Sequence, residues 1–328
     1  MKGEQKISLE DNKMAVQFEK DVVDFFQGTI HGNLGPYIYG APQSEADPVR
    51  GGILYNEMLE HEKEYYLYNY EAALFQSKGT EIASYLGKNT TFIELGPGSE
   101  KSLRLKTLRL LRACSELKGY IGVDISQTFL DKSLAVIRAA LPHIRIEGTQ
   151  QDFTKLESIP DCENPVIFFK GSTIGNFTKE AVPPFIAQMK RLMNKKHLLL
   201  LVQDCNQDEI SLMKAYDTKG MALLMENIMY RIKRDLNIAA MDAAAFRYQP
   251  EWNALTHHLK HVLTATCSQQ FKIKGQEISI QEGQKFHTLS SYKYPATLFQ
   301  EMVRAGGYEL VHDFLDDSGR LAVHLFKG

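Results

Sequence analysis

Short apolar runs alternate with amphipathic segments through the middle of the chain. The runs have the length and β-branched content of buried strands, and five of them read, in order, TTFIELG, GYIGVDIS, IRIEGTQQDF, PVIFFKG and HLLLLVQDC. The segments between them have the apolar spacing of helices and include KSLRLKTLRLLRACSEL, QTFLDKSLAVIRAAL and KEAVPPFIAQMKRLM. Strands that alternate with helices predict a parallel sheet covered by helices on both faces, a doubly wound fold of the Rossmann kind.

The flanking parts of the chain have a different rhythm. Residues ~10–28 have helical periodicity. A Gly- and Pro-rich irregular segment follows, and then a second helical stretch that is interrupted near its tyrosines. Residues 206–286 begin as helix and continue as antiparallel strands, with turns at Lys274-Gly275 and Glu282-Gly283.

The order of elements at the carboxyl end separates two kinds of nucleotide-binding fold. A helix, PATLFQEMVRAG, precedes two strands that flank Asp317. A closing helix and hairpin after five parallel strands is typical of class I S-adenosylmethionine-dependent methyltransferases, whereas nicotinamide-binding Rossmann folds usually continue with another parallel strand. We therefore predict an α/β fold of this class: a Rossmann-like seven-stranded sheet with an antiparallel carboxy-terminal hairpin, plus a smaller α+β substrate or lid domain.

The same rhythm predicts the domain boundaries. Residues 86–205 and 287–328 are expected to form the S-adenosylmethionine-binding methyltransferase domain. Residues 206–286 are expected to form an inserted substrate-binding or lid domain, which the helical amino-terminal segment, residues 1–85, joins.

Composition and charge narrow the possible partners. The 328 residues are 44% hydrophobic and 24% charged, the composition of a globular protein with a large core. The formal net charge is −2 and the basic residues are dispersed, which argues against nucleic acid as a partner. The cysteines are too far apart in sequence for a CxxC pair and are expected to be reduced thiols that hold no metal; they are Cys114, Cys162, Cys205 and Cys267.

The chain shows no membrane or export signal. Its beginning, MKGEQKISLEDNKMAVQFEKDVVDFF, lacks the unbroken apolar core of a secretory signal, and no run approaches the ~20 apolar residues of a membrane span. We expect a cytoplasmic protein without membrane contact, either a monomer or a weak homodimer.

Two glycines follow the first predicted strand in FIELGPGSEKS. Gly96 and Gly98 allow a sharp turn and the close approach of a ligand to the backbone. Lys101 stands where a dinucleotide-binding motif has its third glycine, so the fit to a dinucleotide is poor. Alone, the motif is equally consistent with a plain turn.

Acidic residues at the ends of the next strands raise the significance of that turn. Asp124 ends the second strand, where its carboxylate can accept both ribose hydroxyl protons, and Asp152 and Phe153 end the third, beside an adenine amine and ring. Each aspartate could instead cap the following helix. Together with Glu94, however, they place polar groups at the carboxyl end of successive strands, the edge where such sheets bind ligands.

Several of these segments carry a family resemblance. The chain from about Tyr37 onward resembles the ergothioneine-pathway histidine α-N-methyltransferases, a family that also contains the methyltransferase domain of ovothiol-type sulfoxide synthases and the dimethylallyltryptophan N-methyltransferases. The matching segments are FIELGPGSEKS, GVDIS, QQDF, FFKGSTIGNF and MKAYDTKGMALLMENIMYRIKRDL. The resemblance implies S-adenosylmethionine as cofactor, with contacts from Gly96, Lys101, Asp124, Asp152 and Phe153. Gly171, in GSTIGN, would let cofactor and substrate approach the backbone.

The resemblance also implies substrate contacts. Asn176 and Tyr216 would hold the substrate carboxylate as neutral hydrogen-bond donors, and Tyr39 and Tyr65 would stand near the amine, where Tyr39 or a water chain could relay its proton. The alternatives are structural: Tyr216 and Tyr65 could pack among other aromatic residues, and Asn176 could cap the next helix.

One segment departs from the family pattern. The histidine-specific enzymes have a late strand of the form T-E-I-S-x-K-F, whose Glu and Ser bind the imidazole, whereas TLSSYKY puts Leu289 and Ser291 at those positions. An unpaired imidazole donor beside a leucine would cost roughly 1–3 kcal/mol. In the preceding strand, Lys260 stands approximately where those enzymes carry a methionine near the ring.

These features together predict an N-methyltransferase that uses S-adenosylmethionine and acts on the α-amine of an amino acid or a related small amine. The amino-acid chemistry carries over better than the histidine specificity. Two other hypotheses remain open at this point: a methyltransferase of a protein or RNA, and a non-catalytic S-adenosylmethionine-binding protein.

Overall fold

The computed structural model describes residues 9–193 and 196–328 and divides into two compact units. Residues up to Tyr65 and residues 209–291 form the first unit; residues 66–208 and 292–328 form the second. The predicted boundaries lay at residues 85, 205 and 286. The first of these differs most from the structure, in which the long helix α3 (Tyr66–Leu86) belongs to the unit with the large sheet. The first eight residues, part of the stretch expected to carry no secretory signal, lie outside the described residues.

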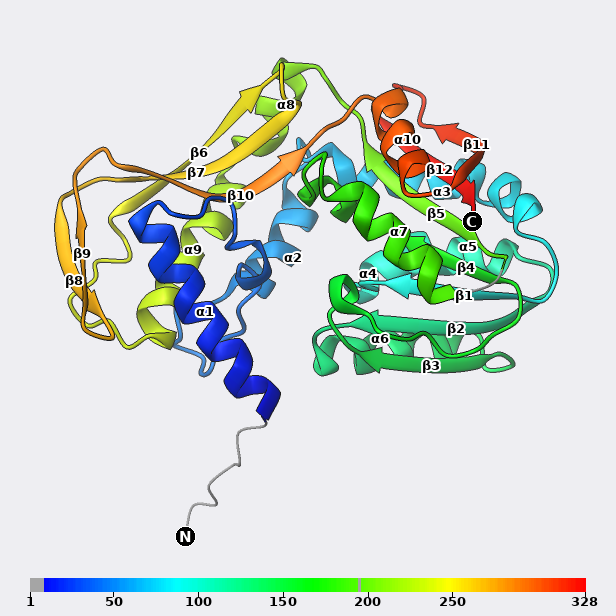
Figure 1. The fold of residues 1–328 in the computed structure, drawn as a ribbon, viewed down its shortest axis with the longest axis horizontal. Helices are drawn as coiled ribbons and strands as arrows, with labels where there is room; N and C mark the ends of the chain where they lie inside the picture. Colours follow the sequence, from blue (N-terminus) through cyan, green and yellow to red (C-terminus); the bar gives the residue numbers. More distant parts are fainter. Residues whose placement is uncertain (1–8, 194–195) are drawn as a thin grey trace, which may run out of the picture. The chain divides into compact units, whose positions relative to one another are not determined.

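The second unit is built on a seven-stranded sheet with the order β11-β12-β5-β4-β1-β2-β3 (Figure 1). The first five strands in sequence are parallel, and β12 is antiparallel to both β5 and β11. This arrangement confirms the predicted class I methyltransferase fold. The strands are β1 (Thr90–Leu95), β2 (Leu117–Asp124), β3 (Arg145–Gln150), β4 (Pro165–Phe169), β5 (Leu198–Asp204), β11 (Glu309–Leu315) and β12 (Leu321–Lys327).

Helices cover both faces of this sheet because its central strands are apolar on both sides. On one face, side chains of α7 (Val182–Met193) and α10 (Ala296–Ala305) share a buried core with Ile93, Ile167 and other strand residues. On the other face, Phe75 of α3 packs edge-on against Phe168, with ring centroids 5.7 Å apart. The remaining helical segments are α4 (Glu100–Ser102), η2 (Leu103–Thr107), α5 (Leu108–Ala113), α6 (Gln127–Ala140), η3 (Phe153–Lys155) and η4 (Thr173–Asn176).

The first unit combines helices with two small antiparallel sheets, of order β10-β7-β6 and β8-β9. The predicted turns at Lys274-Gly275 and Glu282-Gly283 are confirmed, and Gly275 and Gly283 have φ values of +88° and +79°. Strand β6 was not predicted. The elements are α1 (Leu9–Gln27), η1 (Gly35–Tyr37), α2 (Gly51–His61), α8 (Glu209–Tyr216), α9 (Lys219–Asp235), β6 (Phe246–Asn253), β7 (His258–Ala265), β8 (Gln269–Ile273), β9 (Gln276–Ile280) and β10 (Lys285–Tyr292).

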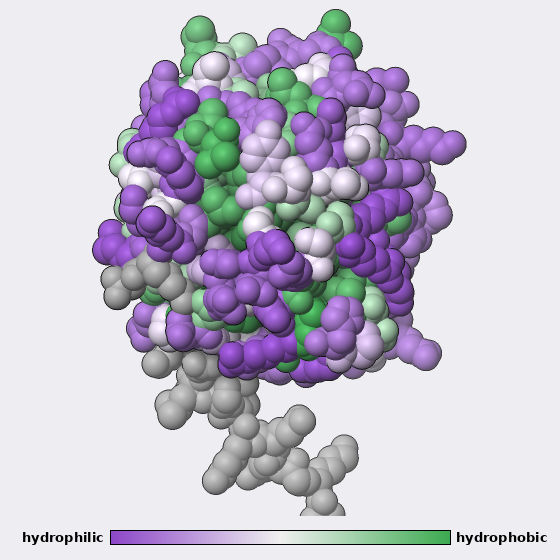
Figure 2. All heavy atoms as spheres, turned by 90° about the vertical axis from the view of Figure 1, so that its right-hand side faces the viewer, coloured by the Kyte–Doolittle hydropathy of each residue, from purple (hydrophilic) through white to green (hydrophobic). Residues whose placement is uncertain are grey.

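The surface carries no sign of a membrane-spanning segment. In the described part of the chain, no helix is both long and apolar enough to cross a bilayer. On the face drawn in Figure 2, hydrophobic residues are interspersed among hydrophilic ones. Single exposed apolar side chains of this kind are normal on protein surfaces.

Candidate active site

The turn after β1 leaves open space beside its backbone. Gly96 and Gly98 have φ values of +68° and +75°, a region that side chains with a Cβ rarely adopt. A Cβ on Gly96 would meet only the Phe153 ring, at 3.9 Å, and one on Gly98 only the Gly96 carbonyl oxygen, at 3.9 Å. The Gly96 N–H donates to the carbonyl of Val123, at 2.8 Å, which ties the turn to the end of β2. The backbone here is positioned for close approach by a ligand.

Asp124, at the end of β2, is not the cap of the next helix. Its Oδ1 accepts the N–H of Ser126, at 2.9 Å, but the hydroxyl of Ser126 caps α6 by accepting from Phe129. Burial raises the pKa of the Asp124 carboxyl, and the nearby Lys170 charge opposes that rise. Hydroxyl groups of a ligand would stabilise this carboxylate in its charged form.

Asp152 caps the short helix η3, which is the alternative role that the sequence left open for it. Its Oδ1 accepts the N–H of Thr154 at 2.9 Å and the hydroxyl of Thr154 at 2.7 Å. Phe153 packs edge-on against Phe169, with centroids 5.1 Å apart, and stands beside Gly96. The ends of β1 and β3 therefore meet at one edge of the sheet.

Lys101 lies just inside the helical segment that follows the glycine turn. Its ammonium is 5.5 Å from the centre of the Tyr68 ring, a cation–π distance, and the residue is otherwise exposed. The structure therefore places it next to the turn, on the surface.

Glu94 is a buried anchor, although sequence reasoning grouped it with the polar groups that face a ligand. It accepts hydrogen bonds from the Thr107 hydroxyl at 2.8 Å and the Tyr120 hydroxyl at 2.6 Å, and it pairs with Lys170. The Lys170 ammonium also donates to the Pro97 carbonyl, at 2.5 Å. A buried ion pair thus holds the glycine turn in place.

A second buried pair holds the turn after β4. Lys106 pairs with Glu71 at 2.6 Å, and the other Glu71 oxygen accepts the N–H of Gly171, at 3.0 Å. Burial lowers the pKa of Lys106, and its attraction to Glu71 opposes that shift. Sequence reasoning missed Glu71 and Lys106, because neither stands in a recognisable motif.

Two residues of GSTIGN explain why the segment needs small groups. Ser172 has a φ of +54°, and its hydroxyl accepts the N–H of Asp204, at 2.7 Å. A Cβ on Gly175 would lie 2.7 Å from the Tyr292 carbonyl oxygen, too close for any other residue to fit without a shift. The segment is therefore packed against the backbone on both sides.

Asn176 does not cap the next helix. The Thr178 hydroxyl accepts the N–H of Ala181 at the start of that helix, at 3.3 Å. Asn176 is exposed, and among the residues that the structure describes its side chain has no hydrogen-bond partner. An amide with unused donors next to a glycine-rich turn is available to a ligand.

A buried polar cluster at the end of β5 also escaped sequence reasoning. Asp204 pairs with Lys293 at 2.7 Å and accepts from the Tyr66 hydroxyl at 2.9 Å. Asn206 donates to the same hydroxyl, at 3.1 Å. Because Ser172 is hydrogen-bonded to Asp204, this cluster supports the GSTIGN turn from its far side.

In the first unit, three predicted substrate residues gather around a histidine that was not predicted. The Tyr65 and Tyr216 rings meet edge-on at 5.4 Å, and Tyr216 meets His261 at 5.6 Å. Ser291 is 3.2 Å from Nε2 of His261.

Neighbouring residues of a strand point to opposite faces of the sheet. Lys260, which the sequence placed near the substrate ring, therefore does not share the face of His261.

Tyr39 and Leu289 make other contacts within the first unit. Tyr39 is 45% exposed and packs edge-on against Tyr55, with centroids 5.0 Å apart. Leu289 forms a backbone bridge with Asn33 and leaves no room for a Cβ on Gly35, which would lie 2.7 Å from its Cδ1.

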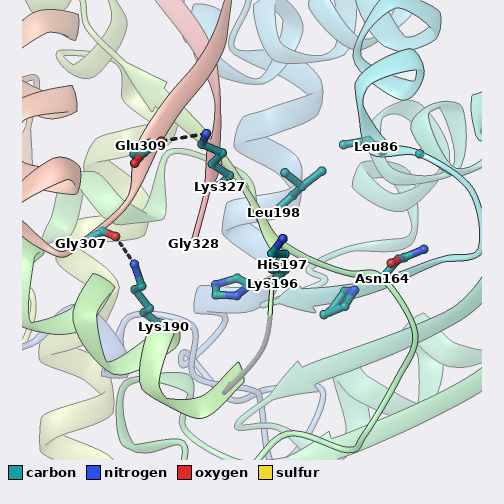
Figure 3. A pocket seen from close by; sticks show the side chains of 12 residues that line it. Leu86, Asn164, Lys190, Lys196, His197, Leu198, Gly307, Glu309, Lys327 and Gly328 are labelled. Atoms are coloured by element: carbon teal, nitrogen blue, oxygen red, sulfur yellow. Dashed lines mark hydrogen bonds and ion pairs between the residues drawn. The ribbon is translucent and has the colours of Figure 1, made fainter.

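A pocket of the second unit lies at the opposite edge of the sheet (Figure 3). Its cavity volume is about 650 Å³, and Pro165 and Leu198, the first residues of β4 and β5, line it. Two of the lysines drawn there have partners in the protein: Lys190 donates to the Gly307 carbonyl and Lys327 pairs with Glu309 at 2.8 Å. Ligands of such sheets bind at the other, carboxyl edge, so we do not assign the active site to this pocket.

We predict that the first unit loses stability below pH 6.5. Burial is the main cause that lowers the pKa of His258 and His287 to about 4, against ~6.5 in an unfolded chain. The unfolded state therefore binds more protons between these values, and the free energy of unfolding should fall by about 2 kcal/mol at pH 5 for each of the two histidines. Urea unfolding followed by the single tryptophan, Trp252, measures this. The pH dependence should flatten in the double variant His258→Gln/His287→Gln; an unchanged dependence would contradict the assignment.

The residues at the carboxyl edge suit S-adenosylmethionine. The glycines have open space beside their backbone, Asp124 carries a partly buried carboxylate, and Phe153 carries an apolar ring. These groups match the chemistry of a ligand that has ribose hydroxyls and an adenine ring. Within residues 9–193 and 196–328, no cluster of His, Cys, Asp or Glu could hold a metal ion. With the sheet order, these features define a class I S-adenosylmethionine-dependent methyltransferase.

The comparisons with known proteins identify the family. A family model described as "Histidine-specific methyltransferase, SAM-dependent" matches residues 47–328, and the chain belongs to this family. Histidine N-alpha-methyltransferase of Mycolicibacterium smegmatis is 28% identical over 80% of this chain and 82% of its own. The 4-dimethylallyltryptophan N-methyltransferase easF of Epichloe festucae var. lolii is 22% identical over 81% of this chain and 85% of its own. The crystal structure of the methyltransferase SibL is 12% identical, with a TM-score of 0.46, and the match covers 96% of this chain and 70% of SibL.

Proposed function

We propose that the protein transfers the methyl group of S-adenosylmethionine to the α-amine of an amino acid or of a related small amine, and that Leu289 alters its side-chain pocket relative to that of the histidine-specific enzymes. The observation that carries this proposal is Asn176, an exposed amide without a partner in the described structure, next to the glycine-rich turn after β4. The names of two relatives, which denote N-methylation of histidine and of dimethylallyltryptophan, support an amino-acid substrate.

The proposed roles follow from the chemistry of each group. Bound S-adenosylmethionine supplies a methyl group already activated by a sulfonium. The protein then has to align a neutral amine with that methyl group, and a free α-amine, with a pKa of ~8, is partly neutral without a strong base. We propose that Asn176 and Tyr216 bind the substrate carboxylate. Tyr39 and Tyr65 would lie beside the amine, and Leu289 and Ser291 would contact the substrate side chain.

The cofactor roles are proposed on the same basis. The glycine turns would face the cofactor. Asp124 would accept hydrogen bonds from its ribose hydroxyls, and Phe153 would pack against its adenine ring. Lys101 and Asp152 would complete the site. The full proposed cofactor set is Gly96, Gly98, Lys101, Asp124, Asp152, Phe153 and Gly171.

A substrate panel tests the proposed function. The purified protein is incubated with methyl-labelled S-adenosylmethionine and separately with amino acids, aromatic amines, a protein mixture and RNA. We expect label in an amino acid or small amine. Label only in protein or RNA would favour a macromolecular methyltransferase, and cofactor binding without any transfer would favour a non-catalytic protein; either result would overturn the proposal.

We predict that Leu289→Glu raises activity on histidine. A carboxylate at this position can accept an imidazole N–H, which should raise kcat/KM for histidine by about tenfold relative to other amino acids. The measurement is kcat/KM for histidine and for phenylalanine with each enzyme, and Leu289→Gln, which is uncharged, is the control. No relative gain for histidine would show that Leu289 does not contact the substrate side chain.

We also propose the cellular setting. The near-neutral formal charge, −2, supports a small-molecule partner over a nucleic acid. We propose that the enzyme is cytoplasmic and acts as a monomer or weak homodimer, with the first unit as its substrate domain.

A further inference from the structure

Three side chains of one sheet form a hydrogen-bonded relay in the first unit. His261 of β7 is buried, with 1% of its surface exposed. Its Nδ1 is 3.0 Å from the Tyr248 hydroxyl of β6, and its Nε2 is 3.2 Å from the Ser291 hydroxyl of β10. The relay leads from a buried phenol to the hydroxyl of Ser291, a partly exposed residue, and Tyr216 packs against its central imidazole.

The buried end of the relay sets its direction. Within the described residues, the Tyr248 hydroxyl has one hydrogen-bond partner, Nδ1 of His261. Burial raises the pKa of Tyr248 well above its ordinary value, so this phenol keeps its proton. A buried O–H that donated to nothing would lose a whole hydrogen bond. Tyr248 therefore donates to Nδ1, and the imidazole proton is on Nε2.

The outer end of the relay follows from that tautomer. Nε2–H of His261 donates to the Ser291 oxygen, so the Ser291 proton must point elsewhere. The structure gives the Ser291 hydroxyl no hydrogen-bond partner other than His261 among the residues that it describes. The hydroxyl is partly exposed and is therefore able to donate to a bound molecule.

We propose that His261, oriented by Tyr248, is a specificity-determining residue that makes Ser291 a hydrogen-bond donor to the side chain of the substrate. This inference rests on the proposed function and narrows its substrate class. The preferred amino acid carries one hydrogen-bond acceptor on an otherwise apolar or aromatic side chain. Leu289, two residues before Ser291, offers no acceptor for an N–H group.

The proton position can be measured without turnover. Nitrogen-15 NMR of histidine-labelled protein reports the tautomer of each ring, and the variant His261→Gln identifies the His261 signals. We expect Nε2 to be protonated and Nδ1 to be an acceptor. Tyr248→Phe should shift the ring toward a mixture of tautomers. A proton on Nδ1 of the wild-type ring would overturn the relay, whether or not the protein methylates amino acids.

The specificity can be measured by binding. Phenylalanine and the three pyridylalanine isomers have nearly the same shape, and each isomer adds one ring acceptor. With S-adenosylhomocysteine present, we expect calorimetry to show that at least one isomer binds about three- to tenfold more tightly than phenylalanine. This ratio should fall to about one in Ser291→Ala and decrease in Tyr248→Phe. Because both affinities are measured on the same protein preparation, their ratio does not depend on the fraction of the protein that is folded.

Ser290 offers a matched control. Its hydroxyl is 3.1 Å from Nε2 of His287 rather than that of His261, so Ser290→Ala should keep the wild-type ratio. An equal ratio in the wild type, Ser291→Ala and Ser290→Ala would overturn the specificity role. Pyridylalanine binding with the expected ratio, but no methyl transfer to any amino acid, would uphold the relay while contradicting the proposed function.

Discussion

Replacing Lys170 by methionine is expected to cost about 3–5 kcal/mol of stability in the second unit. The side chain is buried and pairs with Glu94, which is also buried, so the substitution leaves a carboxylate without its cation in the core. Methionine has similar length and adds no cavity, so the loss reports the charge rather than the packing.

The same substitution should weaken cofactor binding. The Lys170 ammonium donates to the Pro97 carbonyl inside the glycine turn, and a looser turn binds less well because it must be ordered at the moment of binding. We expect the Kd for S-adenosylmethionine to rise about tenfold. Thermal unfolding measures the loss of stability, and titration calorimetry at a temperature well below that transition measures the cofactor affinity.

Two further variants test the cause. Lys88→Met removes a lysine from an exposed pair with Glu116, 2.8 Å apart, and should leave stability nearly unchanged because solvent screens such a pair. The double variant Glu94→Gln/Lys170→Met should recover part of the loss, because no unpaired charge remains buried. A loss in Lys170→Met as small as that in Lys88→Met would show that the pair does not stabilise the fold.

Replacing Asn176 by alanine is expected to lower kcat/KM for an amino acid by about two orders of magnitude. The proposed role is a hydrogen bond from the amide to the substrate carboxylate, a charge-assisted contact that also aligns the amine. Stability should hardly change, because the side chain is exposed and makes no hydrogen bond within the described structure. Steady-state kinetics measures kcat/KM and thermal unfolding measures the stability, while calorimetry with S-adenosylmethionine measures the cofactor affinity.

The variants of Asn176 distinguish between substrate and cofactor. Asn176→Asp keeps the size but places a like charge against the carboxylate, so its activity should fall further than that of Asn176→Ala. Cofactor affinity should stay within about twofold in Asn176→Ala. A Kd for S-adenosylmethionine that rises as much as kcat/KM falls would place Asn176 in the cofactor site instead.

The outline of the fold could be predicted from local patterns. Apolar runs between amphipathic segments specify buried parallel strands, and the order of the last three elements specifies the antiparallel hairpin. Because the carboxyl ends of parallel strands share an edge, the positions of Gly96, Asp124 and Asp152 at one edge of the sheet followed as well. Strand β6 was missed because its proline, Pro250, argues against a strand, although its residues alternate between apolar and polar; β6 lies at the edge of its sheet, where proline is tolerated.

The roles of individual polar residues could not be predicted in this way. Glu94 and Asp124 both stand at strand ends in the sequence, yet Glu94 is satisfied inside the core whereas Asp124 is only partly buried. Glu71 supports Gly171, which is 100 residues away in the chain. Lys260 and His261 are neighbours, and only the pairing of the strands shows which of them meets Ser291.

The sequence by itself therefore determined the class of fold, the edge of the sheet where Gly96, Asp124 and Asp152 lie, and the family. Each of these depends on short-range patterns, in which spacing along the chain is enough to fix geometry. The tertiary structure decided which polar groups are already paired, including Glu94 with Lys170 and His261 with Ser291. A polar side chain has many possible partners, and only the packing of distant segments brings one of them within hydrogen-bond distance and removes the others.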